Sequence, residues 1–283
     1  MENRQYTIRT MQPQEMNMAV EWAAAEGWNP GLHDAECYCT ADPNGFLVGL
    51  LGDEPVAVIS VIKYSAAFGF LGFYIVKPAY RGKGYGIQIW NAGLEYLKGA
   101  NIGLDGVVEQ QDNYKQSGFK LAYRNIRYEG LGGGVAPDNS GIVALSTLPF
   151  EVVESYDRPF LPADRSQFIQ AWISQPDCHA LGVMQDGKLA GYGVMRQCRS
   201  GYKIAPLYAD TPALAEQLFI ALKSRVNVSD LIYLDTPEQN QAAVSLAERH
   251  NMTVSFETAR MYTQTMPALP VARLFGVASF EIG

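Results

Sequence analysis

The chain has 283 residues, which predicts about two domains, and its 48% hydrophobic and 18% charged residues are typical of a globular rather than a disordered or fibrous protein. The formal net charge of −7 argues against a general nucleic-acid-binding protein, which is usually basic. No apolar run is long enough for a membrane-spanning helix, and the N-terminus lacks the apolar core of a secretory signal. Four cysteines are too few for a disulfide framework in a chain of this length. We therefore expect reduced thiols and a cytoplasmic protein that binds neither nucleic acid nor membrane.

The first half of the chain predicts alternating strands and helices. Apolar runs bounded by turns predict strands at residues 6–9, 46–51, 55–64, 70–76, 102–108 and 121–128. Apolar spacing predicts helices at residues 14–25, from the glycines near 84 to about 97, and at 111–117. Gly118 follows the last of these helices and suits a left-handed helix cap.

The second half repeats much of this order. We expect strands at residues 151–156, 181–185, 188–196, 202–208, 231–235 and 253–263, and helices at 165–172, 212–224 and 238–250, with Thr211 capping the second of these helices. Asp186 in a hairpin turn and Asn251 after a helix each lie 133 residues beyond a counterpart, Asp53 or Gly118. This repeat predicts an internal duplication. A glycine-rich stretch at 130–134 reads as a linker, so we place the domains at 1–140 and 141–283.

The most informative local feature is the glycine loop, residues 81–86, with the sequence Arg-Gly-Lys-Gly-Tyr-Gly. It follows an apolar strand and opens a helix, so backbone amides, a helix N-terminus and two basic side chains face one place. This arrangement suits a pyrophosphate group. A P-loop would need a Ser or Thr after the lysine, and a dinucleotide-binding loop would follow the first strand with a different glycine spacing.

Two motifs in the first half resemble a known family. Arg81-x-x-Gly84-x-Gly86, after Val76-x-Pro78, resembles the acyl-CoA signature of the GNAT acetyltransferase superfamily, and Tyr114-x-x-x-Gly118-Phe119 resembles a second segment of that family. The resemblance covers residues 5–128, whereas the second half matches in element order but lacks the glycines near 206–212. The chain thus resembles bacterial tandem GNAT proteins. That resemblance implies an α/β fold of two tandem domains, each a mixed, mostly antiparallel sheet flanked by helices, with a degenerate second domain.

The resemblance also implies a reaction. An acetyl group would move from acetyl-CoA, bound as co-substrate, to a primary amine by direct attack, and we expect a small-molecule acceptor. The strand backbone of Tyr74, Ile75 and Val76 would contact the pantetheine and polarise the thioester. The amides of the glycine loop would hold the pyrophosphate: Arg81, Gly82, Lys83, Gly84, Tyr85 and Gly86. Tyr114 would protonate the leaving thiolate.

The proton acceptor is not assigned by the sequence. Many family members have a carboxylate on the fourth strand, but residues 70–75 include none. The open alternatives for the proton acceptor are His33, Asp34 or Glu36 after the loop at 26–31, Glu109 beyond the fifth strand, or a water relay. His33, Asp34 and Glu109 are also candidates for the acceptor site. Trp28 and Asp105 are further acceptor-site candidates, although Asp105 could equally cap backbone groups.

Several alternatives remain open at this stage. His33, Cys37 and Cys39 lack a fourth ligand, so we expect no metal site. The apolar-acidic end of the chain, residues 280–283, could pack on the second half or enter the cleft. The second domain could shape the cleft, support the first domain, or form a homodimer contact. The alternative function is a non-catalytic acyl-CoA-binding sensor, which the missing strand carboxylate favours and Tyr114 disfavours.

Overall fold

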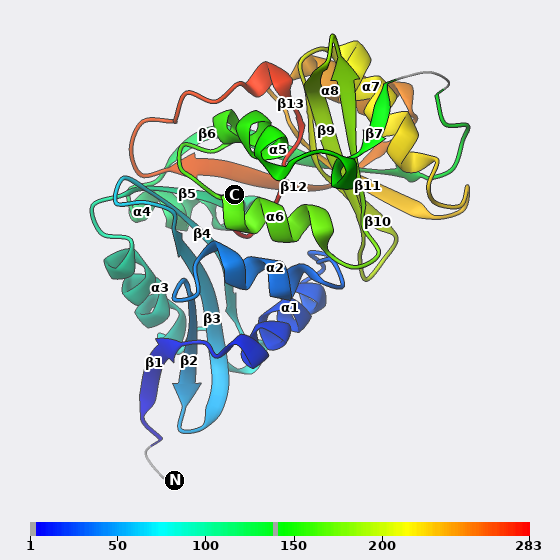
Figure 1. Cartoon of the computed structure of the whole chain (residues 1–283). Coiled ribbons are helices and arrows are strands. Elements are labelled where there is room, and N and C mark those ends of the chain that lie inside the picture. The colour runs from blue at the N-terminus through cyan, green and yellow to red at the C-terminus, as the bar shows by residue number, and fades with distance from the viewer. Residues whose placement is uncertain (1–3, 138–140) are drawn as a thin grey trace.

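The computed structural model describes residues 4–137 and 141–283. Its first half has the order expected from the sequence, with one added helix (Figure 1). The elements are β1 (Tyr6–Thr10), α1 (Met16–Ala25), α2 (Asp34–Ala41), β2 (Phe46–Leu51), β3 (Glu54–Lys63), β4 (Phe68–Val76), α3 (Tyr85–Tyr96), β5 (Asn101–Val107), α4 (Gln111–Gln116) and β6 (Lys120–Leu131).

The second half repeats that order and adds a last short strand. The elements are β7 (Ile142–Ala144), α5 (Phe150–Asp157), α6 (Ser166–Ser174), β8 (His179–Gln185), β9 (Lys188–Gln197), β10 (Tyr202–Ala209), α7 (Pro212–Lys223), β11 (Leu231–Pro237), α8 (Gln241–Arg249), β12 (Thr253–Tyr262) and β13 (Leu274–Gly276). Gly118 and Asn251 both take a left-handed conformation, with φ of 90° and 56°. The domain boundary expected at residue 140 lies outside the described residues.

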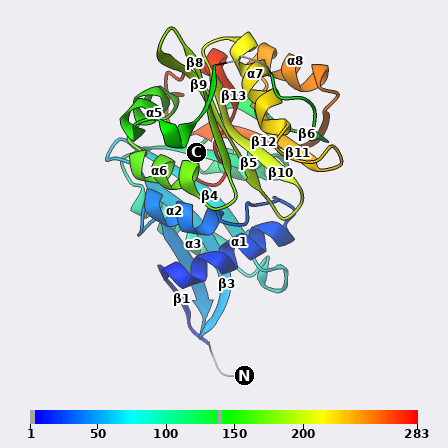
Figure 2. The ribbon, with the colours of Figure 1, turned by 45° about the vertical axis from the view of Figure 1, so that its right-hand side comes forward.

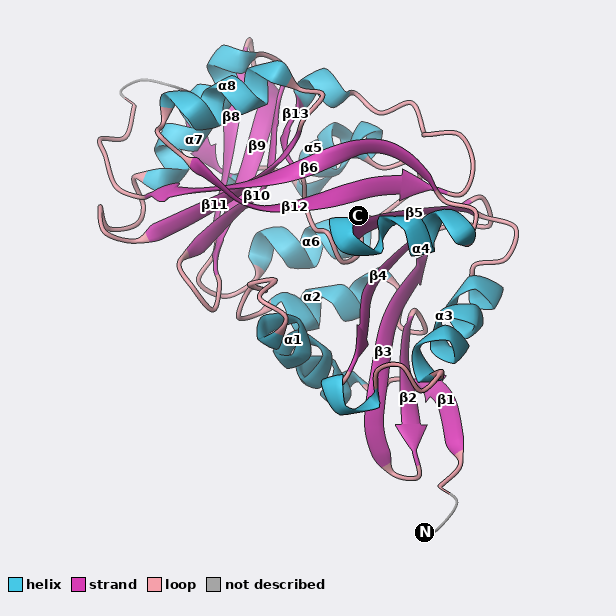
Figure 3. Ribbon diagram, turned by 180° about the vertical axis from the view of Figure 1, so that it is seen from behind, coloured by secondary structure: helices cyan, strands magenta, loops and turns pink. Residues whose placement is uncertain are grey.

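The strands of the two halves join in one continuous sheet, in the order β1-β2-β3-β4-β5-β12-β6-β11-β10-β9-β8-β7. The last long strand of each half is exchanged: β12 pairs with β5 of the first half, and β6 pairs with β11 of the second. These two strands also pair with each other and run across the middle of the molecule (Figure 3). Each half of the sheet is therefore completed by the other half of the sequence.

Helices cover both faces of the sheet. In the first half, α1 and α2 lie on one side of β1–β4 and α3 lies on the other (Figure 3). In the second half, α5 and α6 lie on the opposite side of β8–β10 from α7 (Figure 2). A single hydrophobic core extends through α1, α2, α5 and α6, and in it the rings of Tyr38 and Trp172 stack 5.8 Å apart. Burial of such large rings stabilises the contact between the halves.

Three local expectations are wrong. Residues 151–156 form helix α5 rather than a strand, because Val153, Tyr156 and Asp157 are buried at helical spacing. Helix α2 is not anticipated by the sequence, since its buried positions include Asp34, which an apolar pattern does not reveal. Helix α8 begins later than expected because the side chain of Asn240 caps it by accepting from the Ala243 amide.

The expected cap of α7 is confirmed. Thr211 caps α7 by accepting a hydrogen bond from the Leu214 amide at 3.3 Å. Within residues 4–137 and 141–283, no helix is long and apolar enough to cross a membrane.

Candidate active site

A cavity of about 720 Å³ opens where β4 and β5 separate. The two strands pair in parallel only between residues 68–71 and 101–104. Beyond that point Gly72–Val76 of β4 and Asp105–Val107 of β5 line opposite sides of the cavity. The edge of β4 facing the cavity is therefore free of a strand partner and can offer its backbone to a ligand.

A bulge shapes the open part of β4. The pairing of β3 with β4 shifts between Val58 and Ser60, and Phe73, opposite this shift, has a φ of 46°. A left-handed conformation at a bulky residue costs of the order of 1–3 kcal/mol and persists only where the surrounding structure imposes it. Bulges redirect a strand next to functional sites. The sequence shows no sign of it, because Phe73 lies within an uninterrupted apolar run.

The glycine loop forms the other end of the cavity. Gly82 and Gly84 have φ of 72° and 83°, which only glycine adopts without strain. Gly84 is the N-cap of α3 and no side chain caps it, so the first amides of that helix remain available. Gly86 has no room for a side chain, since a Cβ would lie 2.6 Å from the Tyr74 hydroxyl. These amides and the positive end of the helix dipole suit an anionic group.

The basic residues of the loop are held in different ways. Arg81 lines the cavity; its Nε donates to the Val76 carbonyl at 2.8 Å and its guanidinium pairs with Glu26. The Lys83 Nζ donates to the Ala79 carbonyl at 2.8 Å and its side chain is not among those that line the cavity. The side chain of Tyr85 packs on Tyr6 instead, with ring centroids 4.8 Å apart. Of the six predicted loop residues, Arg81, Gly82, Gly84 and Gly86 line the cavity, and Lys83 and Tyr85 do not.

Tyr114 of α4 lies in the wall of the cavity. It is buried, with 8% of its surface exposed, and its ring stacks on Trp90 at 5.6 Å. Gly106 permits this position, because a Cβ there would lie 2.1 Å from the Tyr114 ring. No described residue forms a hydrogen bond with its hydroxyl. Burial raises the pKa of Tyr114, with Tyr74 and Glu109 acting in the same direction, so the phenol stays protonated at neutral pH.

The acceptor-site candidates divide into two groups. Trp28, Asp105 and Glu109 line the cavity together with Tyr114. His33, Asp34 and Glu36 do not: Asp34 is buried in an ion pair with Arg196, and His33 lies 3.9 Å from Asp177.

Asp105 lines the cavity but has other partners. Its carboxylate accepts from the Arg260 Nε at 2.8 Å and Nη2 at 2.6 Å, and from the Asn125 amide at 2.8 Å. Burial raises the pKa of Asp105, and the Arg260 guanidinium acts in the opposite direction. Asp105 thus joins β5 to the exchanged strand β12.

The other half of the chain supplies cavity residues that the sequence did not reveal, Phe256 and Thr258, and two whose place it left open, Phe280 and Glu281. Phe256 and Thr258 come from β12, and Phe280 and Glu281 come from the C-terminal tail, residues 277–283. No local pattern marks them, because their place depends on strand exchange and on the path of the tail. Their positions settle one open alternative: the end of the chain enters the cleft.

The path of the tail is defined by backbone contacts. The Val277 amide donates to the Asp235 carbonyl, and the hydroxyls of Ser60 and Tyr64 donate to the carbonyls of Glu281 and Ile282, both at 2.8 Å. The terminal Gly283 is buried, and Figure 1 places the C-terminus near the middle of the molecule. The tail therefore runs from the second half into the cavity of the first.

Two family models match the chain. The Acetyltransferase (GNAT) family model matches residues 11–119, and an Acetyltransferase (GNAT) domain model matches residues 153–276. The chain belongs to the GNAT superfamily, with two GNAT domains in tandem. The fold class expected from the sequence is thereby confirmed.

Known proteins resemble this tandem GNAT protein over its whole length. Holothin acyltransferase from Pseudoalteromonas sp. (strain SANK 73390) is 28% identical over 282 residues, covering 100% of this chain and 96% of the relative. A crystal structure of a putative acetyltransferase from Pyrococcus horikoshii superposes with a TM-score of 0.83 at 23% identity, covering 100% and 97% of the two chains. A tandem GNAT protein from the clavulanic acid biosynthesis pathway superposes with a TM-score of 0.65 at 12% identity, covering 93% and 100%. The two structures show the shared fold.

The equivalent opening in the second GNAT domain is filled by the chain itself. β10 and β11 pair in parallel at residues 202–204 and 232–234, and β13 then pairs with β10 where the first domain has its cavity. At the start of α7, Asp210 pairs with Arg273 at 2.7 Å, so an acidic side chain lies where the first domain has its glycine loop. This explains why the second domain can lack the glycines.

A metal site needs several of the cysteines or other metal-ligating side chains to lie together. All four cysteines are free thiols. Among the described residues, no three or more His, Cys, Asp or Glu side chains are grouped so as to hold a metal ion.

Proposed function

We propose that this tandem GNAT protein transfers an acetyl group from acetyl-CoA to the primary amine of a small molecule in the cavity of its first domain. The observation that carries the proposal is one continuous cavity lined by the glycine loop, the unpaired edge of β4 and Tyr114. These are the parts that an acyl-CoA thioester needs: an anion site, backbone donors and a proton donor.

The residues fit the steps of direct transfer. The amides at the start of α3 would hold the pyrophosphate, and the amides on the unpaired edge of β4, within residues 74–76, would polarise the thioester carbonyl. As the amine attacks, the C–N bond forms and the C–S bond breaks. The protonated Tyr114 would give its proton to the leaving sulfur.

The cavity lining supports a small cationic acceptor. Its charged residues are four acids and one base, namely Glu26, Asp105, Glu109, Glu281 and Arg81. Glu26 pairs with Arg81 and Asp105 with Arg260, so Glu109 and Glu281 are the lining acids without a described cation partner, and their negative charge attracts a protonated amine. The aromatic side chains of Trp28, Phe256 and Phe280 supply apolar walls. The relative named Holothin acyltransferase supports acyl transfer as the reaction class.

Thermal unfolding with acetyl-CoA, CoA, ATP and NAD added separately is the first test. A ligand that binds only the folded state raises the melting temperature, so we expect a shift with acetyl-CoA and CoA and none with ATP or NAD. Turnover is then measured by mass spectrometry on a panel of aliphatic and aromatic amines. Binding of acetyl-CoA without acetylation of any amine would favour the non-catalytic sensor.

A further inference from the structure

The first domain lacks a carboxylate on β4, and the C-terminal tail places one beside that strand. The tail crosses β4 at Gly72, where a Cβ would lie 2.2 Å from the Glu281 carbonyl oxygen. The Ser60 hydroxyl of the neighbouring strand β3 fixes the same carbonyl at 2.8 Å. Glu281 is therefore seated at the position along β4 where the strand leaves β5 and the cavity begins.

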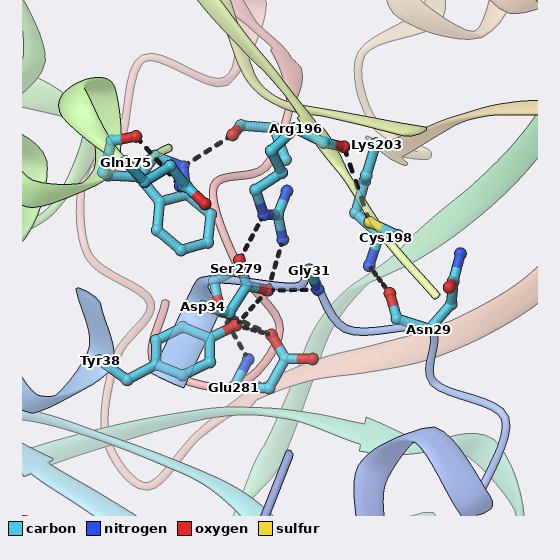
Figure 4. A network of polar contacts seen from close by, with 12 residues as sticks. Asn29, Gly31, Asp34, Tyr38, Gln175, Arg196, Cys198, Lys203, Ser279 and Glu281 are labelled. Atoms are coloured by element: carbon cyan, nitrogen blue, oxygen red, sulfur yellow. Dashed lines mark hydrogen bonds and ion pairs between the residues drawn. The ribbon is translucent and has the colours of Figure 1, made fainter. Parts of the chain in front are cut away.

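The Glu281 carboxylate is held through one oxygen. Oε2 lies 2.6 Å from the Ser279 hydroxyl and 3.1 Å from the Tyr38 hydroxyl. Oε1 has no hydrogen bond or ion pair with any described residue, and Figure 4 shows it pointing away from Tyr38 and Ser279. Glu281 lines the cavity, and its Oε1 is not among the described side-chain oxygens that are both fully buried and without a hydrogen-bond partner, so this oxygen can be reached by a ligand.

The other acids that line the cavity differ from Glu281. Glu26 forms an ion pair with Arg81, and Asp105 forms one with Arg260. Glu109 is exposed at the end of β5. Glu281 is 5% exposed, and its carboxylate is held by two neutral hydroxyls rather than by a cation. A carboxylate shielded from solvent and not paired with a base can accept a proton.

We propose that Glu281 is the general base of the reaction, supplied to the first domain by the end of the second. This inference rests on the proposed function. The ammonium form of the acceptor gives one proton to the Glu281 carboxylate, and the neutral amine attacks the thioester. Tyr114 protonates the sulfur as the C–S bond breaks. The second proton of the nitrogen restores Tyr114, and Glu281 releases its proton to water.

The charges around Glu281 come from several elements. Tyr38 contacts it from α2 and is linked to Asp34, whose charge is balanced by Arg196. Asp105 of β5 and Arg127 of β6 lie close enough for the Glu281 charge to raise the pKa of each. Because charged groups of both signs surround Glu281, the pH profile of a variant must be compared with that of the wild-type protein.

The test is Glu281→Gln, which keeps the shape of the side chain and an oxygen for Ser279 and Tyr38. We expect kcat at pH 7 to fall about 100-fold or more, within the range for loss of a general base, with acetyl-CoA binding and melting temperature unchanged. The loss should shrink as pH rises, because more of the amine is then already unprotonated. A folding defect would not recover in this way. Glu281→Asp should recover part of the rate.

A matched control is Glu257→Gln on β12. Glu257 is partly exposed, pairs with Arg124 and is not among the residues that line the cavity, so its variant should keep the wild-type rate. A Glu281→Gln protein within twofold of wild type at every pH, or a loss that does not change with pH, would overturn the base assignment alone. A wild-type protein that binds acetyl-CoA but acetylates no amine would overturn the proposed function, and the base assignment with it.

Discussion

Replacing Arg196 by Met should destabilise the whole molecule, because Arg196 joins the two halves through a buried ion pair. Its guanidinium donates to Asp34 at 2.7 and 3.1 Å, and the side-chain exposures of the two residues are 2% and 0%. It also lies over the Trp172 ring at 4.3 Å. Removing one partner of a buried pair leaves an uncompensated charge and costs about 3–5 kcal/mol. For a chain of this size, that corresponds to a fall in melting temperature of roughly 6–10 °C.

The loss should depend on pH in a defined direction. Burial alone would raise the pKa of Asp34, but the charge and hydrogen bonds of Arg196, with the Gly31 amide, outweigh it and lower the pKa. A lowered folded-state pKa contributes stability above the unfolded value of about 3.9, and this contribution is lost as pH falls through the folded-state value. In Arg196→Met the guanidinium that lowers the pKa of Asp34 is gone, so burial raises that pKa with much less opposition. The difference from wild type should therefore be largest near neutral pH and smaller below about pH 4.

Urea unfolding at pH 7 and at pH 4 measures both effects. The double variant Arg196→Met with Asp34→Asn serves as the matched control, because it removes the stranded charge. We expect it to be more stable at pH 7 than Arg196→Met alone. A loss below about 1 kcal/mol at pH 7, or a double variant no more stable than the single one, would refute the reasoning.

Three further substitutions test the site. Gly84→Glu should abolish acetyl-CoA binding measured by calorimetry, because it puts a side chain and a negative charge at the N-terminus of α3. Gly99→Glu is the control, since Gly99 also has a positive φ and open space around it but does not line the cavity. Tyr114→Phe should lower kcat by about 100-fold while acetyl-CoA binding stays unchanged, and an unaltered kcat would remove Tyr114 from the acid role. Gly72→Ala should displace the tail at Glu281 and lower kcat by up to about 100-fold, whereas wild-type kinetics would show that the tail does not position the reaction.

The local sequence was sufficient to predict the glycine loop, the place of Tyr114 in a motif and most of the order of helices and strands. Gly82 and Gly84 mark positions of positive φ, and Gly86 marks the close approach of Tyr74. The Thr211 cap depends on a residue three positions away. Such signals act within one turn or one strand. They can be read without knowing what packs on top, and the fold brings the loop, the β4 edge and Tyr114 around one cavity.

The tertiary structure decided what the two halves contribute to each other. The pairing of β5 with β12, the closure of the second opening by β13 and the arrival of Glu281 beside Gly72 join segments that lie far apart in the chain. Asp34 likewise reads as a surface acid in sequence but is buried by an arginine of the other half. Strand pairing and burial depend on which surfaces meet after the chain has closed on itself, and a local pattern does not contain that information.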